Sequence, residues 1–102
     1  MSSRRDLHED LCGILGSRNV YFQPPPSLRM QYPAIVYSLD SFNVSHANDG
    51  KYRNFKRYKL TYIDADPDNE MVEKLLTEIP FCSFDRPFKS DNLNHYIFTI
   101  YN

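Results

Sequence analysis

The 102-residue chain has no tryptophan, only two cysteines and three glycines, and a net charge of −1. The nearly balanced charge argues against a protein that coats nucleic acid, because such domains are usually strongly basic. Cys12 and Cys82 lie far apart among apolar neighbours, so we expect two reduced thiols rather than a disulfide. With so few glycines, the sequence also has no glycine-rich loop that could hold a phosphate group.

Long hydrophobic runs are missing as well. No uncharged apolar run approaches the roughly 18 residues of a transmembrane helix, and acids follow the N-terminal arginines where a signal peptide would have an apolar core. We therefore expect a soluble chain that is not exported. Domains most often have about 100 to 150 residues, so we expect residues 1–102 to form a single domain.

Aromatic residues are abundant, with 8 tyrosines and 7 phenylalanines. Such side chains are common on pleated sheets and in protein interfaces. The composition therefore favours a sheet-containing fold with a role in protein contacts.

Two segments have the apolar spacing of amphipathic helices. Leu7, Leu11 and Ile14 form one stripe in a helix over 3–15, which Ser2 or Ser3 would cap. In the second helix, over 67–79, Asp66 is the expected cap and proline occupies the first position. Its apolar face would contain Met71, Val72, Leu75, Leu76 and Ile79.

Alternating residues predict two antiparallel hairpins. A strand starting at residue 34 continues to a turn at 48–50 and returns over 52–63, with the even positions from Tyr58 to Tyr62 facing the core. The distal part of this hairpin is too polar to be buried in a monomer, so we expect it to project. The second hairpin pairs 81–88 with 95–101. These elements predict an α+β fold: a mainly antiparallel sheet with two helices packed on one face and a long projecting β-hairpin.

Pro24, Pro25 and Pro26 follow a short apolar segment over 19–23. Three consecutive residues without an amide hydrogen cannot belong to a central strand. The segment is therefore either a rigid surface spacer or an arm held toward another molecule.

The polar residues do not form a recognisable catalytic or metal-binding motif. Asp64, Asp66 and Asp68 have the alternate spacing of the first ligands in a calcium-binding loop. However, the loop position that requires glycine is an asparagine here, and the position of the bidentate glutamate is a leucine. The three histidines, at positions 8, 46 and 95, have no ligand spacing. We therefore expect no enzyme activity, no metal and no cofactor.

A run of cations over 51–59 is interleaved with aromatic residues. It has three interpretations: a surface for single-stranded nucleic acid, a solvated hairpin edge, or a contact with an acidic protein neighbour. The residues concerned are Lys51, Tyr52, Arg53, Phe55, Lys56, Arg57, Tyr58 and Lys59.

Four segments are similar in sequence pattern to segments of a known group of proteins. They are VYFQPP over 20–25, YPAIVY over 32–37, YKLTYI over 58–63 and NLNHYIFT over 92–99. Together with the order of the expected elements, they resemble small tail-completion proteins of long-tailed phages and prophages, namely tail terminators and head-tail joining proteins. The resemblance extends from about Leu7 to Tyr101. It includes no motif that can be aligned residue by residue, so it assigns no site residue.

The resemblance implies a structural protein of the virion that is made in the cytoplasm of a bacterial host. Its α+β subunits would form a ring, typically a hexamer, at the end of the tail tube. The ring would stop tube growth and join the tail to the head at the tail-head junction. The implied partners are other copies of the chain, the tail tube protein and a head connector or stopper protein, with DNA only as passing cargo.

A ring needs two unlike contact patches on each subunit, and the proline arm and the projecting hairpin are the two candidates. The interface residues expected on this basis are Tyr21, Phe22, Pro24, Pro25, Pro26, Asp49, Gly50, Tyr52, Arg53 and Phe55. A channel for DNA should repel phosphate, which makes Asp64, Asp66 and Asp68 candidates for its lining. The alternative function is a small cytosolic module that binds single-stranded nucleic acid through the basic hairpin 51–59.

Overall fold

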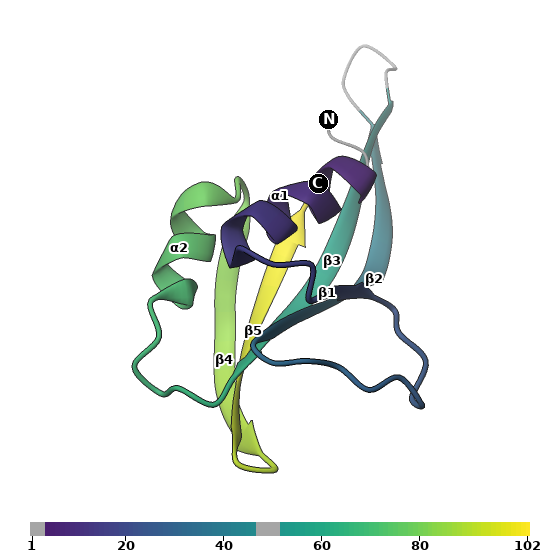
Figure 1. The fold of residues 1–102 in the computed structure, drawn as a ribbon. Coiled ribbons are helices and arrows are strands. Elements are labelled where there is room, and N and C mark those ends of the chain that lie inside the picture. Colours follow the sequence, from purple (N-terminus) through teal and green to yellow (C-terminus); the bar gives the residue numbers. More distant parts are fainter. Residues whose placement is uncertain (1–3, 47–51) are drawn as a thin grey trace.

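The computed structural model of the protein describes residues 4–46 and 52–102 and confirms the α+β class (Figure 1). The predicted cap at Ser2 or Ser3 and the predicted turn at 48–50 lie outside these residues. In chain order the elements are α1 (Arg4–Leu15), β1 (Val20–Phe22), β2 (Ala34–His46), β3 (Tyr52–Asp64), α2 (Met71–Glu78), β4 (Cys82–Ser90) and β5 (Leu93–Tyr101).

The five strands form one sheet in the order β1-β2-β3-β5-β4. Only β1 runs parallel to its neighbour, β2, and every other pair is antiparallel. The β2–β3 pairing extends from Ala34 opposite Ile63 to His46 opposite Tyr52. The predicted long hairpin is therefore confirmed, and the apolar segment before the prolines forms a short edge strand rather than a central one.

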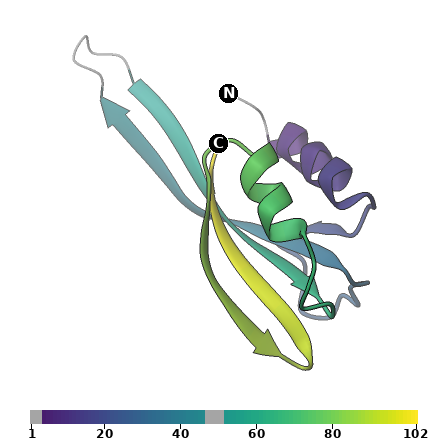
Figure 2. The ribbon, with the colours of Figure 1, turned by 90° about the vertical axis from the view of Figure 1, so that its left-hand side faces the viewer.

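Both helices cover the same face of the sheet (Figure 2). Helix α1 contributes the predicted stripe, and the strands contribute the even positions of β3 together with alternate residues of β2 and β5. Between these two layers lie Leu7, Leu11, Ile14, Ile35, Tyr37, Tyr58, Leu60, Tyr62, Leu75, Ile79, Phe98 and Ile100.

The prediction that α2 begins after Asp66 was wrong, because the helix starts at Met71. The side chain of Asp64 accepts a hydrogen bond from the Asp66 amide, and that of Asp66 accepts one from the Asp68 amide. These side chain to backbone bonds form successive Asx turns, which compete with helix formation. Asn69 Oδ1 then accepts a hydrogen bond from the Met71 amide, at the true start of the helix.

The proline segment is anchored to the sheet at its start. The Gln23 amide donates to the Tyr37 carbonyl at 2.9 Å, and Gln23 Oε1 accepts a hydrogen bond from the Leu39 amide at 3.1 Å. The Leu28 amide donates to the Pro25 carbonyl, which closes a turn within the loop. The residue before the prolines is therefore fixed on the sheet, whereas Pro25 and Pro26 are exposed, and both interpretations of the segment stay predictions.

Candidate assembly surfaces

The distal part of the β2–β3 hairpin extends beyond the rest of the sheet (Figure 1). Strand β5 ends opposite Arg57, and Asn102 and Lys56 then exchange two backbone hydrogen bonds of 3.0 and 3.3 Å. Beyond this point, within the described residues, the two strands of the hairpin pair only with each other. We call residues 42–46 and 52–55 the distal hairpin.

A β-bulge marks the place where the distal hairpin leaves the body. The register between β2 and β3 shifts between Leu39 and Ser41, and Asp40, in the bulge, accepts a hydrogen bond from Arg57 Nε at 2.8 Å. Bulges bend a strand and increase its twist. The chain measures 51 × 28 × 23 Å, and its radius of gyration is 14.7 Å, whereas a compact domain of this length has about 13 Å. The expected projection is thus confirmed.

The edges of the sheet differ in how open they are to further strands. Strand β1 has only three residues, and β4 carries a bulge at Asp85 as well as Pro87 and the cations Arg86 and Lys89. Short strands, bulges, prolines and charges all discourage strand addition. Residues 41–46 and 52–55 contain no proline or glycine, and within the described residues their outer edges have no neighbouring strand. The distal hairpin is therefore the most accessible edge.

Apolar side chains are exposed where α2 meets β4. Phe81 is 80 % exposed and has a positive φ of 56°, a conformation that is uncommon for a bulky residue. Its carbonyl accepts a hydrogen bond from the Tyr101 amide, which fixes the backbone there. Leu76 and Phe84 are also exposed beside this junction. We call Leu76, Phe81 and Phe84, the exposed apolar residues on the elements that meet at this junction, the apolar corner; exposed apolar surface is often a site of interaction.

The outward side of the helical layer is acidic. Asp10, Glu70, Glu73 and Glu78 are exposed, and we call them the acidic helix face. Lys74 lies among these acids and offsets part of their charge; its Nζ donates to the Ile14 carbonyl at the end of α1. Two shallow depressions of about 410 and 390 Å³ lie along these helices and share Lys74 and Glu78 in their lining.

The cations of the basic run do not share one face. Lys56 and Lys59 are both exposed but lie on opposite faces of β3, and Arg57 is paired with Asp40. The side chains of Lys51 and Arg53 lie outside the described part. Because these exposed cations lie on different faces, they do not form a continuous surface for single-stranded nucleic acid. Such a surface needs cations and stacking rings along one groove.

The predicted interface residues fall into three groups. Phe22 packs on the protein's own core, with its ring 4.9 Å from that of Tyr37, and the Tyr21 hydroxyl accepts a hydrogen bond from the Gln31 amide. Pro24 is half-buried, whereas Pro25 and Pro26 are exposed. Tyr52, Arg53 and Phe55 belong to β3 in the distal hairpin, and Asp49 and Gly50 lie outside the described residues.

The three candidate lining residues organise the β3–α2 connection. Besides the two Asx turns, Asp64 accepts a hydrogen bond from the Tyr62 hydroxyl, and burial raises the pKa of Tyr62, so that the phenol keeps its proton. Asp66 and Asp68 are exposed. A local structural role thus accounts for the carboxylates of Asp64 and Asp66, and the assignment of all three aspartates to a channel lining stays a prediction.

No catalytic arrangement is found among the described residues. His8 Nδ1 lies 2.7 Å from the Tyr37 hydroxyl on the helical side, whereas His95 stacks on Phe88 on the opposite face of the sheet. Residues 4–46 and 52–102 contain no group of three or more histidines, cysteines or acids that could hold a metal ion.

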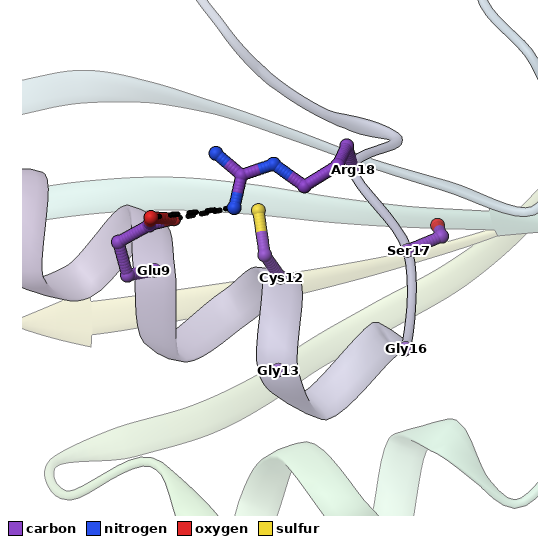
Figure 3. Close-up of a pocket in the computed structure, with 6 residues that line it drawn as sticks. All are labelled: Glu9, Cys12, Gly13, Gly16, Ser17 and Arg18. Atoms are coloured by element: carbon purple, nitrogen blue, oxygen red, sulfur yellow. Dashed lines mark hydrogen bonds and ion pairs between the residues drawn. The ribbon is translucent and has the colours of Figure 1, made fainter.

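The hollow at the end of α1 also lacks a reactive centre (Figure 3). It has a volume of about 470 Å³, and across it Arg18 forms an exposed ion pair of 2.8 Å with Glu9. The Cys12 thiol lies beneath this pair, and burial raises its pKa, which disfavours the reactive thiolate.

Both cysteines are free thiols, as predicted. The reactivity of Cys82 tests whether its side chain is buried at the start of β4, beside the apolar corner. Burial, reinforced by Asp85, raises the pKa of Cys82 to about 11. At pH 8 we expect iodoacetamide to modify it about 100-fold more slowly than in the urea-unfolded chain, because the thiolate is the reactive form. Peptide mass spectrometry separates it from Cys12. Equal rates in the folded and unfolded chains would contradict this packing.

Comparison with known proteins adds no relative. The chain matches no protein-family model, and the search of the curated proteins found no match. Across the described ranges, none of the helices has the length and apolar character needed to cross a membrane.

Proposed function

We propose that this chain is a virion assembly protein of a long-tailed phage or prophage, which forms a ring at the end of the tail tube. The ring, with six copies as its expected number, stops growth of the tube and joins the tail to the head connector or stopper protein. DNA passes through it as cargo. The protein acts at the tail-head junction and is not an enzyme.

The observation that supports the proposal is a pair of unlike, uncovered surfaces on one small body. One is the distal hairpin with its open strand edges, and the other combines the apolar corner with the acidic helix face. The apolar corner lies near the base of the hairpin, because the Phe81 carbonyl accepts a hydrogen bond from the Tyr101 amide and Tyr101 is paired with Arg57. Unlike patches on one subunit make head-to-tail contacts, and such contacts close into rings when the rotation between neighbours allows it.

The ring should be visible on tail tubes. Tube protein produced alone is expected to form tubes of indefinite length, and this chain should bind their ends and shorten them, because a terminator occupies the growing end. Electron microscopy of tubes assembled with and without the chain measures both effects. A chain with the Phe98→Ala core substitution serves as a misfolded control. Unchanged tube lengths with bare ends would contradict the proposal.

The alternative function, binding of single-stranded nucleic acid through the basic hairpin 51–59, is tested by salt titration with fluorescent single-stranded DNA. Binding through phosphates would weaken steeply with salt and disappear when Arg53, Lys56 and Arg57 are neutralised. We expect no binding at physiological salt that depends on these three residues.

A further inference from the structure

A second depression lies at the start of α1, and cationic side chains dominate its lining. It has a volume of about 310 Å³ and is lined by Arg4, Arg5, His8, Glu9 and Arg18. Four of these residues belong to α1, and the fifth follows it in the loop that leads to β1. We call these five residues the basic depression.

Neutral groups hold the Arg4 side chain in place. Its Nη1 donates to the Tyr37 hydroxyl at 3.3 Å, and its guanidinium lies over the Phe22 ring, 4.6 Å from the centroid. Neither of these partners is an acid, so the two contacts orient the guanidinium without neutralising its charge. An arginine that is already oriented loses less side-chain entropy when it binds a ligand.

His8 lies beside this arginine and contacts the same hydroxyl group. Its Nδ1 is 2.7 Å from the Tyr37 hydroxyl oxygen. Burial, reinforced by the positive charge of Arg4, lowers the pKa of His8, so that the imidazole is neutral at pH 7. The depression therefore disfavours a further positive charge, and the same electric field favours an anion.

Glu9 is the only acid in the lining of the depression. It pairs with Arg18, with Oε2 and Nη1 2.8 Å apart (Figure 3). Arg4 and Arg5 have no carboxylate partner within the lining, which carries a net charge of +2 when the imidazole is neutral. Guanidinium groups that line one depression repel each other, and an anion bound between them would remove this repulsion.

We propose that the basic depression binds a phosphate-type dianion, with Arg4 and Arg5 as its main hydrogen-bond donors and Arg18 at its rim. The forked guanidinium group matches the oxygens of a phosphate group. The charges match as well, because a phosphate monoester carries about −1.5 to −2 at neutral pH. A carboxylate has a single negative charge and would leave half of the net charge uncompensated.

Titration of the purified chain with inorganic phosphate at pH 8 tests the site, with amide chemical shifts in two-dimensional NMR as the readout. Chloride at the same ionic strength is the reference, because it reproduces the screening by salt. We expect saturable shifts at the start of α1 and around Arg18. Arg5→Gln should weaken phosphate binding about 10-fold, because a charge-assisted hydrogen bond is lost.

Glu9→Gln should have the opposite effect. It removes the only acid of the lining and frees Arg18, so phosphate should bind at least ~3-fold more tightly. Arg29→Gln is the matched control, because it removes the same charge from an exposed residue outside the depression. This variant should bind phosphate within about 2-fold of the wild type. Circular dichroism establishes that every variant is folded.

Adenosine monophosphate distinguishes two sources of the dianion. Binding at least as tight as that of inorganic phosphate would assign a phosphate ester, and weaker binding would assign free phosphate. Shifts that do not saturate, that occur equally in chloride or that persist unchanged in Arg5→Gln would overturn the site. The basic depression shares no residue with the surfaces proposed for the ring, so neither result depends on ring formation.

Discussion

A chain in which an Asn-Gly turn replaces residues 44–54 is expected to remain folded and to lose its self-association. Asn43 and Phe55 are paired across the hairpin, and a two-residue turn of this sequence can close such a pair. Among the residues whose burial the structure describes, those of the two-layer core lie outside the deleted segment, so the melting temperature should change by less than about 5 °C. Association should weaken by at least ~100-fold because one of the two contact surfaces is removed.

A matched control uses the same turn in the other hairpin. Asp91 and Asn92 connect β4 to β5 with φ values of 53° and 64°, which are typical of a type I′ turn, so Asn-Gly fits there without strain. This control should associate as the wild type does. Sedimentation velocity over a range of concentrations measures both variants. Wild-type association in the chain without the distal hairpin would remove that segment from the interface.

Phe98→Ala is expected to have the largest effect on stability. Phe98 is fully buried at the centre of the sheet, opposite Leu60 on β3 and Phe84 on β4, and its ring makes an edge contact with that of Phe84 at 5.3 Å. Removing a buried phenyl ring costs about 3 to 5 kcal/mol, from lost burial and from the cavity that remains. Domains of this size have a free energy of unfolding of about 5 to 15 kcal/mol, so the variant should lose a large share of this free energy and unfold at a much lower urea concentration.

Phe81→Ala is the matched control for this substitution. Its ring is 80 % exposed, so the free energy of unfolding of the monomer should change by less than about 0.5 kcal/mol, while self-association weakens. Urea unfolding at high salt and low protein concentration measures both variants as monomers. A Phe98→Ala chain within about 1 kcal/mol of the wild type would show that the helices do not pack on the sheet as described here.

Local patterns in the sequence were sufficient to predict most of the architecture. Alternation identified β2 and β3 and the face of β3 that carries Tyr58, Leu60 and Tyr62, because one face of an antiparallel sheet must be buried. The same alternation, together with the polar distal positions, predicted the projecting hairpin. The stripe in α1 was visible because every apolar residue in it faces the sheet.

The errors arose where side chains compete with the backbone for hydrogen bonds. Asp66 followed by proline is a typical helix start, yet the aspartates form turns and α2 begins only at Met71. The bonds that Gln23 makes to β2 before the prolines are likewise contacts across the fold. Sequence periodicity contains no information about such pairings.

The sequence predicted one of the two candidate surfaces and missed the other. The hairpin was expected, but the apolar corner was not, because Leu76 has helical spacing and Phe81 precedes a strand, so both resemble core residues. The charge separation between 51–59 and 64–78 is visible in the sequence. The fold brings the two segments closer than β3 alone would, because Phe81, just after α2, is bonded to Tyr101, which is paired with Arg57.

The proposed function requires that this small body leaves surfaces which other copies of itself, or an adjoining component of the particle, cover. Sedimentation of the wild-type chain, alone and with assembled tail tubes, tests it most directly over concentrations from about 1 to 500 µM. The account predicts a single closed oligomer, in solution or on the tube ends, whose formation depends on the distal hairpin. A chain that remains monomeric throughout this range and leaves the tubes bare would contradict it.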